Sequence, residues 1–356
     1  LFRQESDRQW PRVICRVREE LDKAILIFRK RDKGNRSNGA LTAKVIDMAN
    51  SDLLDRAIAY HRGGDLGEAQ RLYEVMLKER REGQVVHLLG VVRYQQGSYA
   101  EAAALIEEAI GLDPRQATFY SNLGNVYKAL GQEERALRCF DQAIGLDGGY
   151  ADAHYNLANS LRALGRLEEA LASYERALAV RSEFAEALNN RGNVLRSMGR
   201  LQEALSSFEG ALKVNPQFVD AVLNRGNTLR DLGQPDQALS CYEVVLSLRP
   251  GYAEAYNNKG NALQQMGRYE EALSSYGMAI GSKPNFAEAY LNRGNANKAL
   301  ERYEAALEDY DKALANRPGY AEAFNNKGNV LKDLGRVKEA LEHYELALCA
   351  DPNLAS

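Results

Sequence analysis

Asparagine recurs in two columns of this chain at a spacing of 34 residues, and its side chain is the best candidate here for recognition chemistry. A carboxamide both donates and accepts hydrogen bonds, so it can pair with the backbone of an extended peptide whatever the peptide's sequence. Asparagine is also a poor helix former, so its return within helical segments needs a reason. The first column is Asn122, Asn156, Asn190, Asn224, Asn258, Asn292 and Asn326. The second column, three residues further on, is Asn125, Asn159, Asn193, Asn227, Asn261, Asn295 and Asn329.

The two columns admit two interpretations. If their segments are helices stacked about 10 Å apart, an extended chain advancing about 3.3 Å per residue meets one asparagine at roughly every third residue. Alternatively, the asparagines bond to one another or to neighbouring repeats as polar spacers on a solvated face. Both interpretations stay open for the first column, whereas the second is better placed to bridge repeats. Replacing Asn190, Asn224 and Asn258 by alanine separates them, because a peptide-binding ladder would lose its partner without a change in melting.

Basic side chains accompany the asparagines. One column reads Lys128, Arg162, Arg196, Arg230, Gln264, Lys298 and Lys332, and we place Arg162, Arg196 and Arg230 in the same binding groove as the amides. Another, confined to later units, reads Arg191, Arg225, Lys259, Arg293 and Lys327. Their ordinary interpretation is ion pairing with the abundant acidic groups. The alternative is a basic wall that selects acidic or C-terminal carboxylate ligands, and strong salt sensitivity of binding would favour it.

Helical hairpins position these side chains. In residues 151–184, apolar or small residues first follow an i, i+3, i+4, i+7 pattern up to Leu164, which is typical of an amphipathic helix. Gly165 then interrupts the pattern where a tight turn is needed. A second periodic run starts at Leu167, and five other units carry a proline just after the equivalent run, which cannot continue a helix.

Two columns of the second run indicate how the hairpins pack. One is alanine in nine successive units, from Ala69 to Ala340, as expected where two helices approach most closely. The other holds one large residue per unit, as at Phe140 and Tyr174. With the turn glycine and the closing proline, these residues resemble the tetratricopeptide repeat. The units begin near Asn50, Gly83, Ala117, Ala151, Ala185, Val219, Ala253, Ala287 and Ala321.

The resemblance implies an all-α fold, a right-handed α-solenoid superhelix of about nine hairpins with an extra N-terminal helix. It also implies a concave groove lined by the first helix of each pair. In addition, the asparagine column is similar to the superhelical region of protein O-linked N-acetylglucosamine transferases, where it implies binding of substrate polypeptides.

Residues 1–49 differ from the repeat region at residues 50–354. An apolar stripe from Val13 to Phe28 predicts a capping or docking helix, and a basic and polar linker follows. Part of this segment, between Leu1 and Leu21, is similar to the closing segment of bacterial glycosyltransferase domains found in tetratricopeptide proteins. The chain starts at Leu1 rather than Met, so we expect it to be a fragment of a larger protein.

The composition excludes several function classes. With 27% charged residues and a net charge of −3, nothing draws the chain to nucleic acid or an anionic membrane. The longest apolar run, Ala24–Phe28, cannot cross a bilayer. The four cysteines and four histidines are scattered over the repeats, which argues against disulfides, metal sites and nucleophile–base pairs. We therefore predict a non-enzymatic protein without metal or cofactor, located in the cytoplasm of a bacterium.

The leading hypothesis is a scaffold that binds an extended polypeptide or a partner protein in its groove. The first alternative is the substrate-recruiting arm of a bacterial glycosyltransferase whose catalytic domain is not in this chain. The second is a self-assembling structural unit, associating through the uncapped C-terminal repeat or the N-terminal helix.

Overall fold

This structure, a computed structural model, describes residues 51–352, which form helices and turns without a β-strand. The predicted N-terminal helix and linker in residues 1–49 lie outside the described residues. The chain divides into two compact units, residues 1–115 and residues 116–356.

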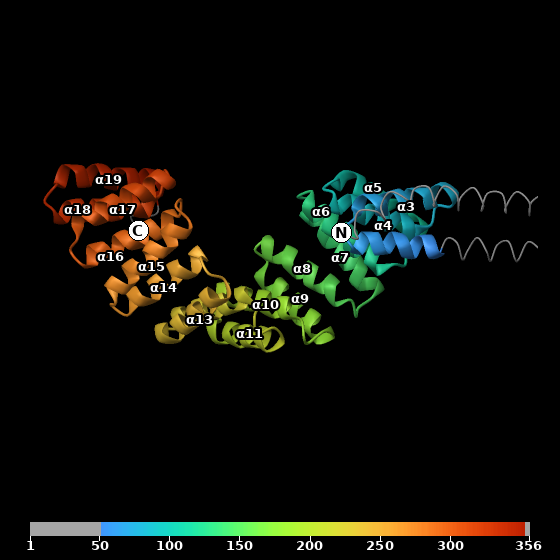
Figure 1. Cartoon of the computed structure of the whole chain (residues 1–356), viewed down its shortest axis with the longest axis horizontal. Helices are drawn as coiled ribbons and strands as arrows, with labels where there is room; N and C mark the ends of the chain where they lie inside the picture. Colours follow the sequence, from blue (N-terminus) through green and yellow to red (C-terminus); the bar gives the residue numbers. More distant parts are fainter. Residues whose placement is uncertain (1–50, 353–356) are drawn as a thin grey trace, which may run out of the picture. The chain divides into compact units, whose positions relative to one another are not determined.

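The described part of the first unit contains four helices (Figure 1). Residues 51–62 form a helix that the turn at 63–64 links to α3 (Leu66–Glu79). The next pair is α4 (Gly83–Gln95) and α5 (Tyr99–Leu112). Asp65 begins α3 by accepting the backbone N–H of Glu68 at 3.1 Å, a typical N-cap bond.

The described part of the second unit, residues 116–352, is built of seven helical hairpins. The first helices have 13 residues each and are α6 (Ala117–Ala129), α8 (Ala151–Ala163), α10 (Ala185–Ser197), α12 (Val219–Asp231), α14 (Ala253–Gln265), α16 (Ala287–Ala299) and α18 (Ala321–Asp333). The second helices have 14 residues each and are α7 (Glu133–Leu146), α9 (Leu167–Val180), α11 (Leu201–Val214), α13 (Pro235–Leu248), α15 (Tyr269–Ser282), α17 (Tyr303–Asn316) and α19 (Val337–Ala350). The predicted solenoid of helical hairpins is confirmed.

The turn within each hairpin depends on a left-handed residue. The turn glycines from Gly131 to Gly335 have φ between 71° and 75°, a region that glycine enters without steric cost. Glu301 stands where the other turns have glycine and adopts φ 57°. The turn geometry is therefore kept in that repeat, at the expense of backbone strain.

The first helices form a layer of their own in this unit. Every first helix packs on its own second helix, and each one from α8 to α18 also packs on the second helix before it. Successive first helices also contact one another, from α6 with α8 to α16 with α18, whereas second helices do not pack on one another to this extent within residues 116–352. The layer of first helices is thus the tighter one, which is the inner side of a curved stack.

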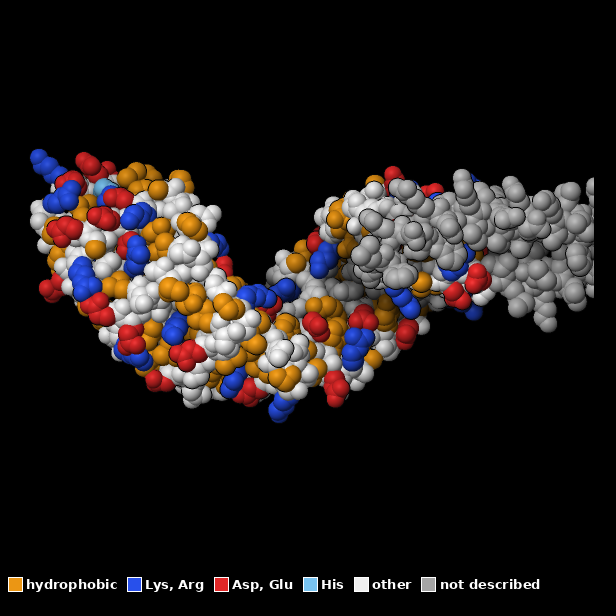
Figure 2. Space-filling view, viewed as in Figure 1, with side chains coloured by type: hydrophobic (Ala, Val, Ile, Leu, Met, Phe, Trp, Pro, Cys, Tyr) orange, Lys and Arg blue, Asp and Glu red, His pale blue; other side chains and the backbone are white. Residues whose placement is uncertain are grey.

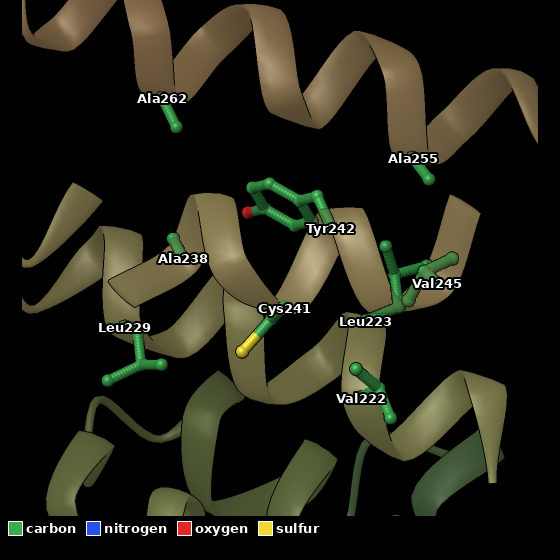
Figure 3. Packing of buried hydrophobic residues seen from close by; sticks show 9 residues of the cluster. All are labelled: Val222, Leu223, Leu229, Ala238, Cys241, Tyr242, Val245, Ala255 and Ala262. Carbon is green, nitrogen blue, oxygen red and sulfur yellow. The ribbon is translucent and has the colours of Figure 1, made fainter. Parts of the chain in front are cut away.

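Small residues and aromatic rings alternate in the core. Ala238, Ala255 and Ala262 are fully buried around Tyr242, whose ring lies between its own helix α13 and α14 (Figure 3). A glycine of the first helix faces the same ring, since a Cβ added to Gly226 would lie 2.9 Å from Cε1 of Tyr242. Close approach at this point explains why the column holds only glycine or alanine.

Candidate polypeptide-binding surface

The asparagines of both columns lie on the first helices of the second unit and are half-buried. They come from α6, α8, α10, α12, α14, α16 and α18, so one pair belongs to each hairpin. Helical spacing places the two members of a pair one turn apart, on neighbouring positions of the same face. The pairs therefore follow one another along the layer of first helices.

The second column is held by tyrosines of the second helices. In five repeats a tyrosine hydroxyl donates to the asparagine Oδ1, as Tyr276 does to Asn261 at 2.8 Å. The bonds to Oδ1 of Asn159, Asn227, Asn295 and Asn329 come from Tyr174, Tyr242, Tyr310 and Tyr344 at 2.6–2.9 Å. Where the large residue is Phe140 or Phe208, no hydroxyl is available for Asn125 or Asn193. This column thus ties the two helices of a hairpin together.

The first column reaches back to the preceding repeat. Three of its members donate from Nδ2 to Oδ1 of a second-column asparagine: Asn190 to Asn159 at 3.0 Å, Asn258 to Asn227 at 3.0 Å and Asn326 to Asn295 at 2.9 Å. Two others donate to a different residue: Asn224 to Asn189 at 3.0 Å and Asn292 to Asn257 at 3.0 Å. Bridging between repeats, one of the two interpretations of these columns, is therefore present in the structure.

These bridges orient the amide groups of the first column. The Nδ2 atoms point along the stack, so the Oδ1 atoms remain as acceptors. Within residues 116–352, Oδ1 of Asn190 takes a weak bond of 3.3 Å from Asn189, while Oδ1 of Asn224, Asn258 and Asn292 receives no donor. Half-buried acceptors at regular intervals can receive N–H groups from a ligand backbone.

Asn189 and Asn257 are bridging residues that the sequence analysis missed. Both are buried, with 6% and 1% of their surface exposed. Their column alternates, with Asn189, Leu223, Asn257, Leu291 and Asn325 in successive repeats. This alternation was the signal that could have revealed them, because the two first-column asparagines that bond to this column lie in the repeats with leucine.

The predicted basic residues of the groove lie near the C-terminal ends of their helices. Arg162 is exposed, whereas Arg196 and Arg230 are half-buried. Nε of Arg196 donates across repeats to Asp231 Oδ2 at 2.8 Å, and Nη2 of Arg230 donates to Asp231 Oδ1 at 3.2 Å. One carboxylate is therefore shared by two guanidinium groups, so this pair of arginines keeps an excess of positive charge.

The later basic column is engaged in ion pairs. Arg191, Lys259 and Lys327 each pair with an acidic residue of the preceding second helix at 2.5–3.2 Å. Arg225 lies 3.9 Å from Glu209 in the same arrangement. Figure 2 accordingly shows basic and acidic side chains interspersed over α14 to α19. Ion pairing, the ordinary interpretation of this column, is what the structure shows.

Arg293 pairs differently because its expected partner is absent. The position that holds the acid in the preceding repeats is Gly277 in this one. Arg293 instead makes two bonds, of 2.6 and 3.0 Å, to Asp309 of its own repeat. Asp309 is only 3% exposed and also accepts Nδ2 of Asn297 at 3.0 Å. The carboxylate raises the pKa of the Arg293 guanidinium, and the buried charge is fully compensated.

Neither a metal centre nor a membrane span is found among residues 51–352. No group of three or more His, Cys, Asp or Glu side chains there is arranged to hold a metal ion. No helix in this range is long and apolar enough to cross a membrane. Cys139, Cys241 and Cys349 form no disulfide with one another.

The fold and this surface define a helical-repeat solenoid with a polar inner layer. Family models of the tetratricopeptide repeat match this chain over residues 53–74, 90–219 and 226–351. The chain belongs to the tetratricopeptide repeat (TPR) family. A comparison with curated protein sequences found no match.

Several solved structures are similar. PilF of Pseudomonas aeruginosa shares 25% identity with a TM-score of 0.51, covering 58% of this chain and 94% of its own. One chain of the APC/C hetero-tetramer Cut9–Hcn1 shares 14% identity with a TM-score of 0.56, covering 75% of this chain and 52% of its own. YrrB, described as a TPR protein with an unusual peptide-binding site, shares 33% identity with a TM-score of 0.44, covering 53% and 97%.

Proposed function

We propose that the chain is a protein-interaction scaffold that binds an extended polypeptide along the first helices of residues 116–352. The observation that carries this proposal is the row of half-buried asparagines whose Nδ2 atoms are engaged between repeats while their Oδ1 atoms remain as acceptors. A ligand backbone can donate its N–H groups to this row independently of its side chains. The bridging bonds contribute by holding each amide in one orientation before the ligand arrives.

The test must separate binding from stability, because each bridge joins two asparagines. Replacing Asn190, Asn258 and Asn326 by alanine removes three bridges together with the proposed acceptors. Replacing Asn159, Asn227 and Asn295 by alanine breaks the same three bridges from the other end but leaves the first column in place. The two triple variants are therefore matched controls for each other.

Peptides selected from a random 12-residue library against the unmodified chain serve as probes. The first triple variant is expected to lose at least tenfold in affinity by fluorescence anisotropy, and the second no more than threefold. Both should melt at a lowered temperature, and the second variant at the lower one, because it also removes the acceptors of the Tyr174, Tyr242 and Tyr310 hydroxyls. Equal losses of affinity in the two variants would show that the asparagines act only as structural bridges.

Self-association is a second candidate, supported by α19. Val337, Leu341 and Leu348 lie on one side of this helix and are 65%, 59% and 42% exposed. The residues equivalent to the two leucines in α13, Leu239 and Leu246, are partly buried against their core cluster. We expect a concentration-dependent increase in sedimentation coefficient that is lost in Leu341→Lys. The glycosyltransferase arm remains a prediction, because the residues that suggest it lie outside the described part.

A further inference from the structure

Three successive first helices of the second unit present a row of guanidinium groups. Arg162, Arg196 and Arg230 occupy the same position in α8, α10 and α12. Asp231, 29% exposed at its side chain, is the acidic group that bonds to two of them. In the next repeat the position is Gln264, whose Oε1 accepts the hydroxyl of Tyr276 at 3.0 Å. The row of guanidinium groups is therefore three repeats long, follows Lys128 at the same position of α6, and has an excess of two positive charges over Asp231.

This row runs in step with the first-column amides. Asn156, Asn190 and Asn224 come from the same three helices as the arginines. The helices repeat at a spacing of about 8–10 Å. A ligand that uses both rows must therefore offer a backbone donor and an anionic side chain once per repeat, always toward the same side.

The geometry of extended chains decides which backbone meets that requirement. In a β-strand, side chains alternate between two faces, so every third residue changes side. In a polyproline II helix, three residues make one turn with a rise of about 3.1 Å each, so every third residue returns to the same side after about 9 Å. A polyproline II segment is therefore commensurate with the helix stack, and a β-strand is not.

The backbone chemistry agrees with this choice. A polyproline II helix has no internal hydrogen bonds, so its N–H groups are free to donate to an external acceptor. The Oδ1 atom of Asn224 is an acceptor of this kind. The residue that faces each amide must keep its N–H, whereas proline is allowed at the other two positions of each triplet.

We propose, on the basis of the polypeptide-binding function above, that residues 156–231 bind an acidic polyproline II segment with Asp or Glu at every third position. Each ligand carboxylate pairs with one guanidinium of the row. The next repeat has Gln264 at this position and therefore offers no positive charge for a further carboxylate. Asp231 competes with the ligand for Arg196 and Arg230. Removing its charge should therefore strengthen binding.

The experiment measures affinity for defined peptides at two salt concentrations. The probe is a labelled peptide of five Glu-Pro-Ala triplets, compared with a peptide of the same composition and irregular glutamate spacing and with a Gln-Pro-Ala peptide. We expect the regular acidic peptide to bind about tenfold more tightly than either, with the preference reduced by salt. Equal affinity for the regular and irregular peptides would overturn the commensurate register.

Protein variants test the residues. Replacing Arg162, Arg196 and Arg230 by glutamine should weaken the regular acidic peptide by about tenfold. The matched control replaces Arg166, Arg200 and Arg268, which pair with glutamates three residues further on, and should change affinity less than twofold. Asp231→Asn should tighten binding about threefold, which a purely structural role for this carboxylate would not produce. Unchanged binding by the first triple variant would overturn the proposal.

The outcomes also separate this inference from the proposed function. Suppose that the Gln-Pro-Ala peptide binds as tightly as the acidic one and loses affinity only in the Asn190, Asn258 and Asn326 variant. The preference for regularly spaced acidic residues is then refuted, whereas the proposed polypeptide-binding function is supported. If the asparagine variants behave alike while the acidic peptide still requires the arginines, the backbone ladder fails instead.

Discussion

One small residue in each first helix of residues 116–352, glycine in all of them except α8, determines how closely the second helix approaches. A Cβ added to Gly260 would lie 2.5–2.8 Å from three atoms of the Tyr276 ring, and that ring is fully buried. Gly277, by contrast, lies on a helix with no atom within 4 Å of an added Cβ. The two glycines therefore differ in packing while sharing the same gain in helix propensity on replacement by alanine.

We predict that Gly260→Ala destabilises the chain by about 1–2 kcal/mol, because overpacking exceeds the propensity gain. Gly277→Ala should stabilise it by up to about 1 kcal/mol. Urea unfolding followed by circular dichroism measures both changes. Ala158 stands at the position of Gly260 in an earlier repeat, which shows that a helix pair can accommodate this methyl group. A larger loss of stability is therefore not expected. Equal stabilisation by the two variants would contradict the close approach inferred at Gly260.

At the scale of elements, the helices and turns could be predicted from the sequence because each depends on residues within one repeat. Gly165 and the apolar periodicity of residues 151–178 suffice to define a hairpin. The partners of the amides are harder to predict, because they depend on residue identities one repeat away. Asn190 bonds to Asn159, but Asn224 bonds to Asn189, and the only sequence signal of this difference is the alternation of asparagine and leucine in the column of Asn189.

Ion pairs between elements follow a rule that the chain itself allows to be tested. The cations of the later column pair with an acid on the preceding second helix, as Lys259 does with Glu243 at 3.1 Å. In an earlier repeat the acid is Asp141, but the cation position holds Leu157. Partial burial raises the pKa of Asp141, although Arg166 and Arg176 act in the opposite direction. Asp141 thus lacks the partner that its counterparts have.

We predict that Leu157→Arg supplies this partner and lowers the pKa of Asp141, as measured by NMR titration of the carboxyl group. Combining it with Asp141→Asn in a double-mutant cycle should give a coupling energy of about 0.5–1 kcal/mol. Leu157→Gln is the control, because it introduces a long polar side chain without charge. An unchanged pKa in Leu157→Arg, with the fold intact, would disprove the pairing rule.

On the scale of the whole molecule, a stack of repeats gains its stability from contacts between neighbouring repeats. A buried side chain that can become charged therefore destabilises its own repeat and the adjacent ones first. His87 is such a group in the first unit. It is 7% exposed on α4, and burial followed by the charge of His61 lowers its pKa from 6.5 to about 4. The equivalent position holds buried Leu223 and Leu291 in two later repeats, which shows that the column accepts an apolar side chain.

The lowered pKa of His87 predicts an acid-sensitive unit. The unfolded chain binds a proton at His87 more readily than the folded chain does. The contribution of neutral His87 to the free energy of unfolding is therefore fully present above pH 6.5 and is lost as the pH falls toward about 4. The free energy of unfolding should fall by at most about 1.4 kcal/mol per pH unit, and by about 3 kcal/mol in total between pH 6.5 and 4. Denaturant unfolding of the chain at several pH values between 7 and 4, compared with His87→Leu, measures it. The variant should lose this part of the pH dependence while remaining at least as stable at pH 7, since its buried side chain never has to shed a proton. Parallel pH profiles for the two proteins would mean that His87 is not the group that titrates on unfolding.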